Sequence, residues 1–152
     1  MIVKDSINYI ALINENKYKA KELAFQTINN NPNILNTGSS DGLLFQTFHN
    51  SVKNSNIGKF DKIQKHITGK NFTAAKALNL TINPINLIET NCKEVNRIYL
   101  DRIVYDSIVS TNDSLILVNI ALQSPSIGGK AVYKARALLY LYPQPDSLLS
   151  YN

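Results

Sequence analysis

Residues 120–139 read IALQSPSIGGKAVYKARALL, and this stretch decides the fold class. An apolar helical pattern ends near residue 123, and a new one begins after residue 129. Between them stand Pro125, Gly128 and Gly129. Proline fixes its own φ and glycine tolerates a positive φ, so these residues are typical of a tight turn. The stretch predicts two helices joined by a structural turn at Ser124–Gly129.

The same spacing of three or four residues between apolar positions runs through most of the chain, whereas strand-like alternation is nearly absent. Asparagine, proline and glycine interrupt it at intervals. The pattern predicts helices over residues 4–14, 17–30, 41–54, 59–68, 72–81, 85–109, 113–123 and 129–142. We therefore expect an all-α fold of about seven antiparallel helices, arranged as a compact bundle or a short solenoid-like stack.

Each predicted helix has an apolar face that we expect to be buried. In residues 17–30 this face is Ala20, Leu23, Ala24 and Ile28, and in residues 41–54 it is Leu44, Phe45, Phe48 and Val52. The longest helix presents Ile88, Cys92, Val95, Tyr99 and Ile103. We expect it to pack on the last helix through Val132, Ala135 and Leu139.

Length and charge limit the possible functions. A chain of 152 residues suits one domain, so residues 1–152 are expected to form a single helical domain. The net charge of +5 lies in the first half, where ten lysines face five acidic residues in residues 1–76. The basic segment at residues 59–76 is the best nucleic-acid candidate. Its charge density favours an ordinary solvated helix face instead.

The residue types that carry chemistry are sparse and scattered. His49, His66 and Cys92 lie too far apart in sequence to suggest a metal site, and a lone cysteine cannot form an intrachain disulfide. No nucleophile stands in a recognisable catalytic motif. No apolar run approaches the ~18 residues of a membrane span. We expect a protein that is not an enzyme and has no cofactor, metal or transmembrane helix.

The 120–139 stretch resembles a segment of secreted Bacteroidota proteins, just upstream of the C-terminal sorting domain for type IX secretion. That segment reads Ile-Ala-x-Gln-Cys-Pro-x-x-Gly-Gly-x-Ala-Val-Tyr-x-Ala-Arg-Ala-Leu, and the family's Val-Asn-x-Ile-Tyr-Leu run resembles Glu94–Leu100. The resemblance is strongest over residues 94–142. Ser124 stands where the family has cysteine. Residues 1–93 resemble the family only in their predicted arrangement of paired helices.

The resemblance implies a structural segment of a larger exported protein, located outside the cell or on its surface. No functional residue carries over, because the motif has no activity assigned to it. The first residues of the chain make a poor signal peptide, since Ile7–Ile13 is short and no small-residue cleavage site follows. We expect the signal peptide and the sorting domain to lie outside this chain.

Four aspartates are each followed by serine and an aliphatic residue, which resembles the O-glycan acceptor of exported Bacteroidota proteins. Asp-Ser before an apolar residue is also a common helix start, so capping is the competing interpretation. The candidate glycosylated serines are Ser6, Ser107, Ser114 and Ser147.

Three functions follow from these observations. The first is a non-catalytic structural or linker domain of an exported protein, whose partners are other segments of the same polypeptide or another protein. The second is a helical-repeat interaction module, which an exposed apolar groove would favour. The third is a basic nucleic-acid-associated protein, which strongly salt-dependent retention on DNA or RNA would favour.

Overall fold

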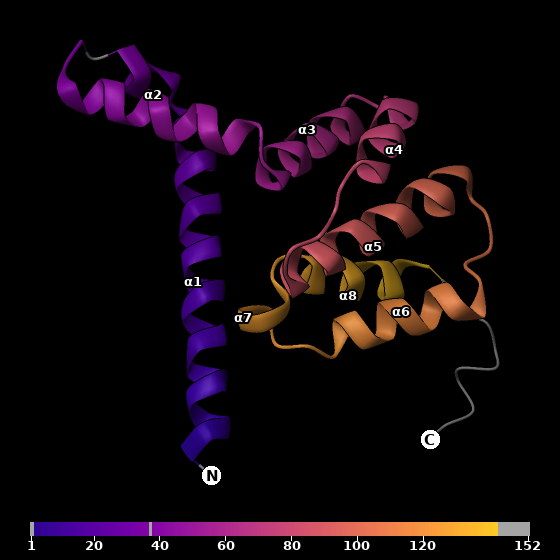
Figure 1. Ribbon diagram of the computed structural model, residues 1–152. Coiled ribbons are helices and arrows are strands. Elements are labelled where there is room, and N and C mark those ends of the chain that lie inside the picture. The colour runs from indigo at the N-terminus through magenta and orange to yellow at the C-terminus, as the bar shows by residue number, and fades with distance from the viewer. Residues whose placement is uncertain (1, 37, 143–152) are drawn as a thin grey trace. The chain divides into compact units, whose positions relative to one another are not determined.

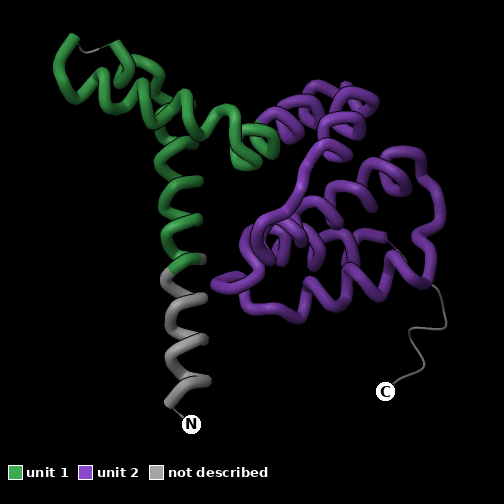
Figure 2. The backbone as a smooth tube through the Cα atoms, viewed as in Figure 1, with its two compact units in different colours: residues 1–61 green, residues 62–152 purple. Residues whose placement is uncertain are grey.

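The computed structural model describes residues 2–36 and 38–142, with side chains at residues 14, 16–36 and 38–142. These residues form eight α-helices and two short 3₁₀ helices, with no strand among them (Figure 1). The predicted all-α fold is confirmed. One domain is expected from the sequence, whereas contacts between residues group the chain into two compact units, residues 1–61 and 62–152 (Figure 2). Each unit is described by itself.

Unit 1 is built on a long helix and a shorter one that returns to it. It contains α1 (Ile2–Asn30), the 3₁₀ helix η1 (Pro32–Asn36), α2 (Ser40–Lys53) and the start of α3 (Asn56–Thr68). A small core joins α1, α2 and the start of α3: Phe25, Val52 and Ile57 are buried, with Tyr18 and Phe48 packed against them.

The two helices predicted over residues 4–14 and 17–30 are one continuous helix, so the predicted break is wrong. Residues 14–16 contain neither proline nor glycine, and asparagine and glutamate are tolerated inside a helix. The predicted end is right, because α1 stops at Asn30, two residues before Pro32.

The predicted inward faces of unit 1 are only partly correct. In α1, Phe25 and Ile28 are buried, but Leu23 is 66% exposed. In α2, Val52 is buried, whereas Leu44 is 66% and Phe45 40% exposed. A small unit has too few neighbouring elements to cover every apolar face of a long helix, so part of each predicted face stays open.

Unit 2 is a helical bundle. After the end of α3 it contains α4 (Phe72–Leu80), α5 (Leu87–Asp101), the 3₁₀ helix η2 (Ile103–Tyr105), α6 (Thr111–Ala121), α7 (Pro125–Gly128) and α8 (Ala131–Leu141). Helix α6 packs on α8, and α5 contacts α4, α6, α7 and α8 (Figure 1). Val95, Val132 and Ala135 are buried, and α5 and α8 are in contact, as the sequence predicts.

The longest predicted helix, over residues 85–109, is too long at its C-terminal end. Helix α5 stops at Asp101, a single 3₁₀ turn follows, and Asp106 takes a left-handed conformation with φ 50°. No proline or glycine marks this end. Tertiary packing ends the helix, because the segment that follows buries Ile103 and Val109, and Arg102 hydrogen-bonds to Asp113 of the next helix.

Polar side chains cap three of the helices. Asn71 caps α4, with its side-chain oxygen accepting the Ala74 N–H. Ser39 caps α2, and Ser110 caps α6. A cap of this kind satisfies a backbone N–H that has no partner within its own helix.

Candidate functional site

The turn predicted at Ser124–Gly129 is a short capped helix and not an open loop. Ser124 caps α7, and Pro125 occupies its first turn, where a missing N–H costs nothing. Gly129 has φ 73° and ψ −165°, a conformation that is essentially restricted to glycine. Gly128 has no positive φ, but a Cβ there would lie 2.6 Å from Val132 Cγ2. Glycine suits both positions, for two different reasons: a positive φ at Gly129 and lack of space at Gly128.

Polar contacts tie this turn to α5. Asn91 Nδ2 donates to the Gly128 carbonyl at 3.1 Å and to Gln123 Oε1 at 2.6 Å. Arg136 of α8 donates to the carbonyls of Ala121 and Gln123, which lie at the C-terminal end of α6. These bonds satisfy backbone carbonyls that have no partner within their own helix. The arrangement fixes the path between α6 and α8.

The most strongly charged cluster lies at the start of α6. Asp113 is 3% exposed, and its carboxylate accepts from Arg97 at 2.8 Å, Arg102 at 3.3 Å and Ser110 at 2.9 Å. Burial opposes ionisation, but these donors outweigh it and hold the pKa of the Asp113 carboxyl below its ordinary value. Every oxygen is used in joining α5, η2 and α6, so the cluster is structural.

The four candidate glycosylation sites lie in different environments. Ser107 is exposed, in the loop after Asp106. Ser114 is fully buried, and because a glycan is confined to the surface, the fold is incompatible with a sugar there. Ser6 belongs to α1, but its side chain lies outside the described residues, and so does Ser147 altogether. Ser107 is the candidate that the structure places at the surface.

The other sequence candidates are dispersed. Cys92 is a buried free thiol, and His49 stacks on Phe25 with ring centroids 5.1 Å apart. No group of three metal-ligating side chains gathers among the described residues. In the basic segment, Lys76 pairs with Asp101 at 2.6 Å and Phe60 is buried, so Phe60 cannot stack on a base. As predicted, no helix in the described part of the chain has the length and apolarity to cross a membrane.

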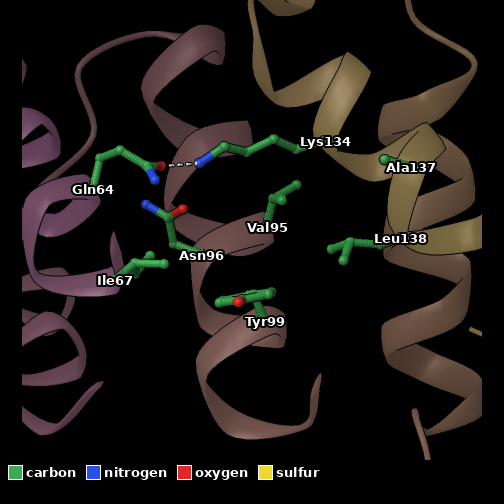
Figure 3. Close-up of a pocket in the computed structure, with 8 residues that line it drawn as sticks. All are labelled: Gln64, Ile67, Val95, Asn96, Tyr99, Lys134, Ala137 and Leu138. Carbon is green, nitrogen blue, oxygen red and sulfur yellow. Dashed lines mark hydrogen bonds between the residues drawn. The ribbon is translucent and has the colours of Figure 1, made fainter. Parts of the chain in front are cut away.

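Unit 2 contains a pocket of about 230 Å³ between α3, α5 and α8 (Figure 3). Its walls are mainly apolar, formed by Ile67, Val95, Tyr99, Ala137 and Leu138. Three polar side chains, those of Gln64, Asn96 and Lys134, reach it from three different helices. An apolar pocket with a few converging polar groups is the usual form of a small-molecule site.

Lys134 is the only cation in this pocket lining. Its Nζ donates to Gln64 Oε1 at 2.8 Å across the pocket (Figure 3). Burial lowers the pKa of the Lys134 ammonium from its ordinary value. No carboxylate among the described residues pairs with it.

Unit 1 contains a larger apolar groove of about 710 Å³. One side consists of α1 residues Ala20, Leu23, Ala24, Thr27 and Ile28, and the other of Ile34 from η1 and Leu44, Phe45 and Phe48 from α2. These are largely the residues that the sequence analysis expects in the core. The groove is therefore formed by those parts of the predicted apolar faces of α1 and α2 that stay exposed.

Neither the pocket nor the Asp113 cluster was predicted from the sequence, although the pocket leaves a signal there. Lys134 stands among Ala131, Ala135 and Leu138, on an otherwise apolar helix face. Asn96 likewise stands between Cys92 and Tyr99 on the apolar face of α5. A polar residue in the middle of an apolar stripe indicates either a buried hydrogen bond or a site.

Comparison of the chain with protein-family models, with curated proteins and with solved structures found no match.

Proposed function

We propose that this chain is a non-catalytic helical module of an exported or cell-surface protein, and that it binds an amphipathic helix of a partner protein in the groove of unit 1. The exported location rests on the resemblance of residues 94–142 to the segment that precedes type IX sorting domains. The binding function rests on the groove, which is apolar and larger than the pocket of unit 2.

The groove has the dimensions of a helix-binding surface. Its α1 side runs from Ala20 to Ile28, nine residues that rise by about 12 Å along the helix. This equals two turns of a partner helix, enough for anchors at i, i+3 or i+4, and i+7. Ala20 and Ala24 are small and one turn apart, so a partner backbone can approach closely, while Leu23, Leu44 and Phe45 flank it.

Charge at the edge of the groove selects the kind of helix. Lys17 and Lys21 each precede a groove alanine by three residues, so they lie beside it on the helix surface. Both are exposed, and neither pairs with a carboxylate among the described residues. A partner helix with acidic side chains along one edge complements this rim, whereas a basic helix does not.

A synthetic peptide tests this proposal on the full chain. The probe is an amphipathic helix with leucines at i, i+4 and i+7 and glutamates beside them, and its control replaces each glutamate by lysine. We expect fluorescence anisotropy to show saturable binding of the acidic peptide and much weaker binding of the basic one. Binding of neither peptide, or equal binding of both, contradicts the proposal.

The chain offers a matched pair of variants. Leu43 and Leu44 are adjacent and both 66% exposed, but only Leu44 lines the groove. We expect Leu44→Asp to weaken peptide binding by about tenfold or more, because it removes a buried apolar contact and buries a charge, while Leu43→Asp leaves binding unchanged. If Leu44→Asp only dissociates a dimer seen by sedimentation, the occupant is a second copy and the partner-helix proposal fails.

The location is tested separately, by cell fractionation. Peptides of this chain are expected in the culture medium or on the cell surface of the source bacterium. Their confinement to the cytoplasm would exclude the exported role without affecting the groove.

A further inference from the structure

The pocket of unit 2 contains a charge that the protein itself does not balance. The Lys134 side chain is partly buried along the pocket, and its one described hydrogen bond, which is open to solvent, goes from its ammonium to the neutral amide oxygen of Gln64. Burying an ammonium group is costly unless a negative group pairs with it. An anion placed beside Lys134 would therefore supply the pairing charge that the described residues do not.

A second polar group in the pocket, the Asn96 amide, makes no hydrogen bond within the described residues. Asn96 is 6% exposed, and its side chain lines the pocket. Figure 3 shows this amide on the same side of the pocket as the Lys134 ammonium. Polar groups in protein interiors almost always have a partner, so this amide is available to hydrogen-bond a group that enters the pocket from outside the chain.

The geometry points to a binding site for a small monocarboxylate with an apolar body: we propose that its carboxylate lies between Lys134 and Asn96 and its body lies against Val95, Tyr99 and Leu138. A carboxylate has two oxygens, so it can accept from the ammonium and the amide together. The apolar walls disfavour a compact, fully hydrated anion such as phosphate, which would lose its water without gaining contacts.

The size of the cavity limits the ligand. A volume of 230 Å³ holds about eight non-hydrogen atoms at the packing of a liquid, which is the size of hexanoate. Hexanol has the same apolar body without the charge, so the pair separates recognition of the carboxylate from simple hydrophobic binding. This inference concerns unit 2 alone and does not depend on the proposed helix-binding groove.

Titration of the full chain with hexanoate, followed by NMR, tests the proposal. We expect saturable shifts at Val95, Asn96, Tyr99 and Lys134, and an affinity for hexanoate about tenfold or more above that for hexanol, as a charge-assisted hydrogen bond provides. Lys134→Met should remove the preference for hexanoate, while Lys130→Met, one helical turn away and exposed, should keep it.

A second measurement uses the unmodified protein, in case Lys134→Met does not fold. Hexanoate should slow acetylation of the Lys134 amine and leave that of Lys62, an exposed lysine of α3, unchanged. Absence of saturable shifts at these residues with hexanoate, equal affinity for hexanol, or unchanged labelling of Lys134 would each overturn the proposal.

Discussion

At the scale of single residues, Asp113 shows how one carboxylate can join three elements. It lies in the first turn of α6, where its N–H donates to the Ser110 hydroxyl oxygen. Its carboxylate pairs with two arginines, Arg97 of α5 and Arg102, the residue directly after α5. The carboxylate is nearly inaccessible, but Arg97 and Arg102 are 32% and 42% exposed. Solvent therefore screens part of the attraction, and the cluster is worth less than a fully buried ion pair.

We predict that Asp113→Asn lowers the free energy of unfolding at pH 7 by about 1–3 kcal/mol, because Arg97 and Arg102 lose their counter-charge. The native pKa of Asp113 lies below its unfolded value, so the ionised carboxylate stabilises the fold above about pH 4. This contribution is lost as the pH falls through the native pKa.

Urea unfolding between pH 7 and pH 2 measures this effect. The wild-type chain should lose more stability below pH 4 than Asp113→Asn does. Asp106→Asn is the control, since Asp106 is exposed and asparagine tolerates its left-handed conformation. An Asp113→Asn variant with unchanged stability and the same acid sensitivity would contradict this account.

At the scale of elements, the turn and α5 determine how unit 2 is assembled. Helix α5 is buried on more than one face, because Ile88, Val95, Ile98 and Leu100 are all at most 2% exposed. The turn meets this helix closely, since a Cβ on Gly129 would lie 2.7 Å from Ile88 Cγ2. The conformation of one glycine and the position of a central side chain are therefore coupled.

We predict that Gly129→Val destabilises the chain by at least about 2 kcal/mol, because it combines a strained backbone with crowding against Ile88. Gly38→Val separates the two causes: Gly38 has φ 62°, but nothing lies within 4 Å of its Cβ position, so a smaller loss is expected. Lys130→Ala, an exposed neighbour of the turn, should be nearly neutral. Equal melting temperatures for Gly129→Val and Lys130→Ala would refute a structural role for the turn.

At the scale of the whole molecule, the two units have cores of different size. Unit 1 is centred on Phe25, Val52 and Ile57, whereas α5, α6 and α8 of unit 2 bury a much longer set of side chains. Local stability follows the amount of buried apolar surface around an element. The chain should therefore not unfold as one uniform block.

Native-state hydrogen exchange measures this difference. Backbone amides of α5 and α6 are expected to exchange more slowly than those of α1 and α2, because opening unit 1 exposes less apolar surface. Val52→Ala should accelerate exchange in α1 and α2 while leaving α5 unchanged. Equal protection across both units, or acceleration of both by Val52→Ala, would show that they unfold as a single cooperative domain.

The sequence by itself determined the helical class, most helix positions and the turn. The signals are the apolar spacing of three to four residues, Pro32 after α1, and the glycines at 128 and 129. They act through local backbone geometry, which depends on residues close together in the sequence. The buried inner face of α5, at Ile88, Cys92 and Val95, was also predictable.

Tertiary structure alone decided where α5 ends, which apolar faces remain exposed to solvent and which polar side chains lie close together. Leu23 and Leu44 have the same spacing as buried residues, and only the number of helices available to cover them leaves them exposed. Gln64, Asn96 and Lys134 lie 32 and 38 residues apart along the chain, yet they share one pocket. Contacts of this kind depend on how the helices pack. Helical periodicity predicts which face of a helix is buried, but it does not predict which other helix packs against that face.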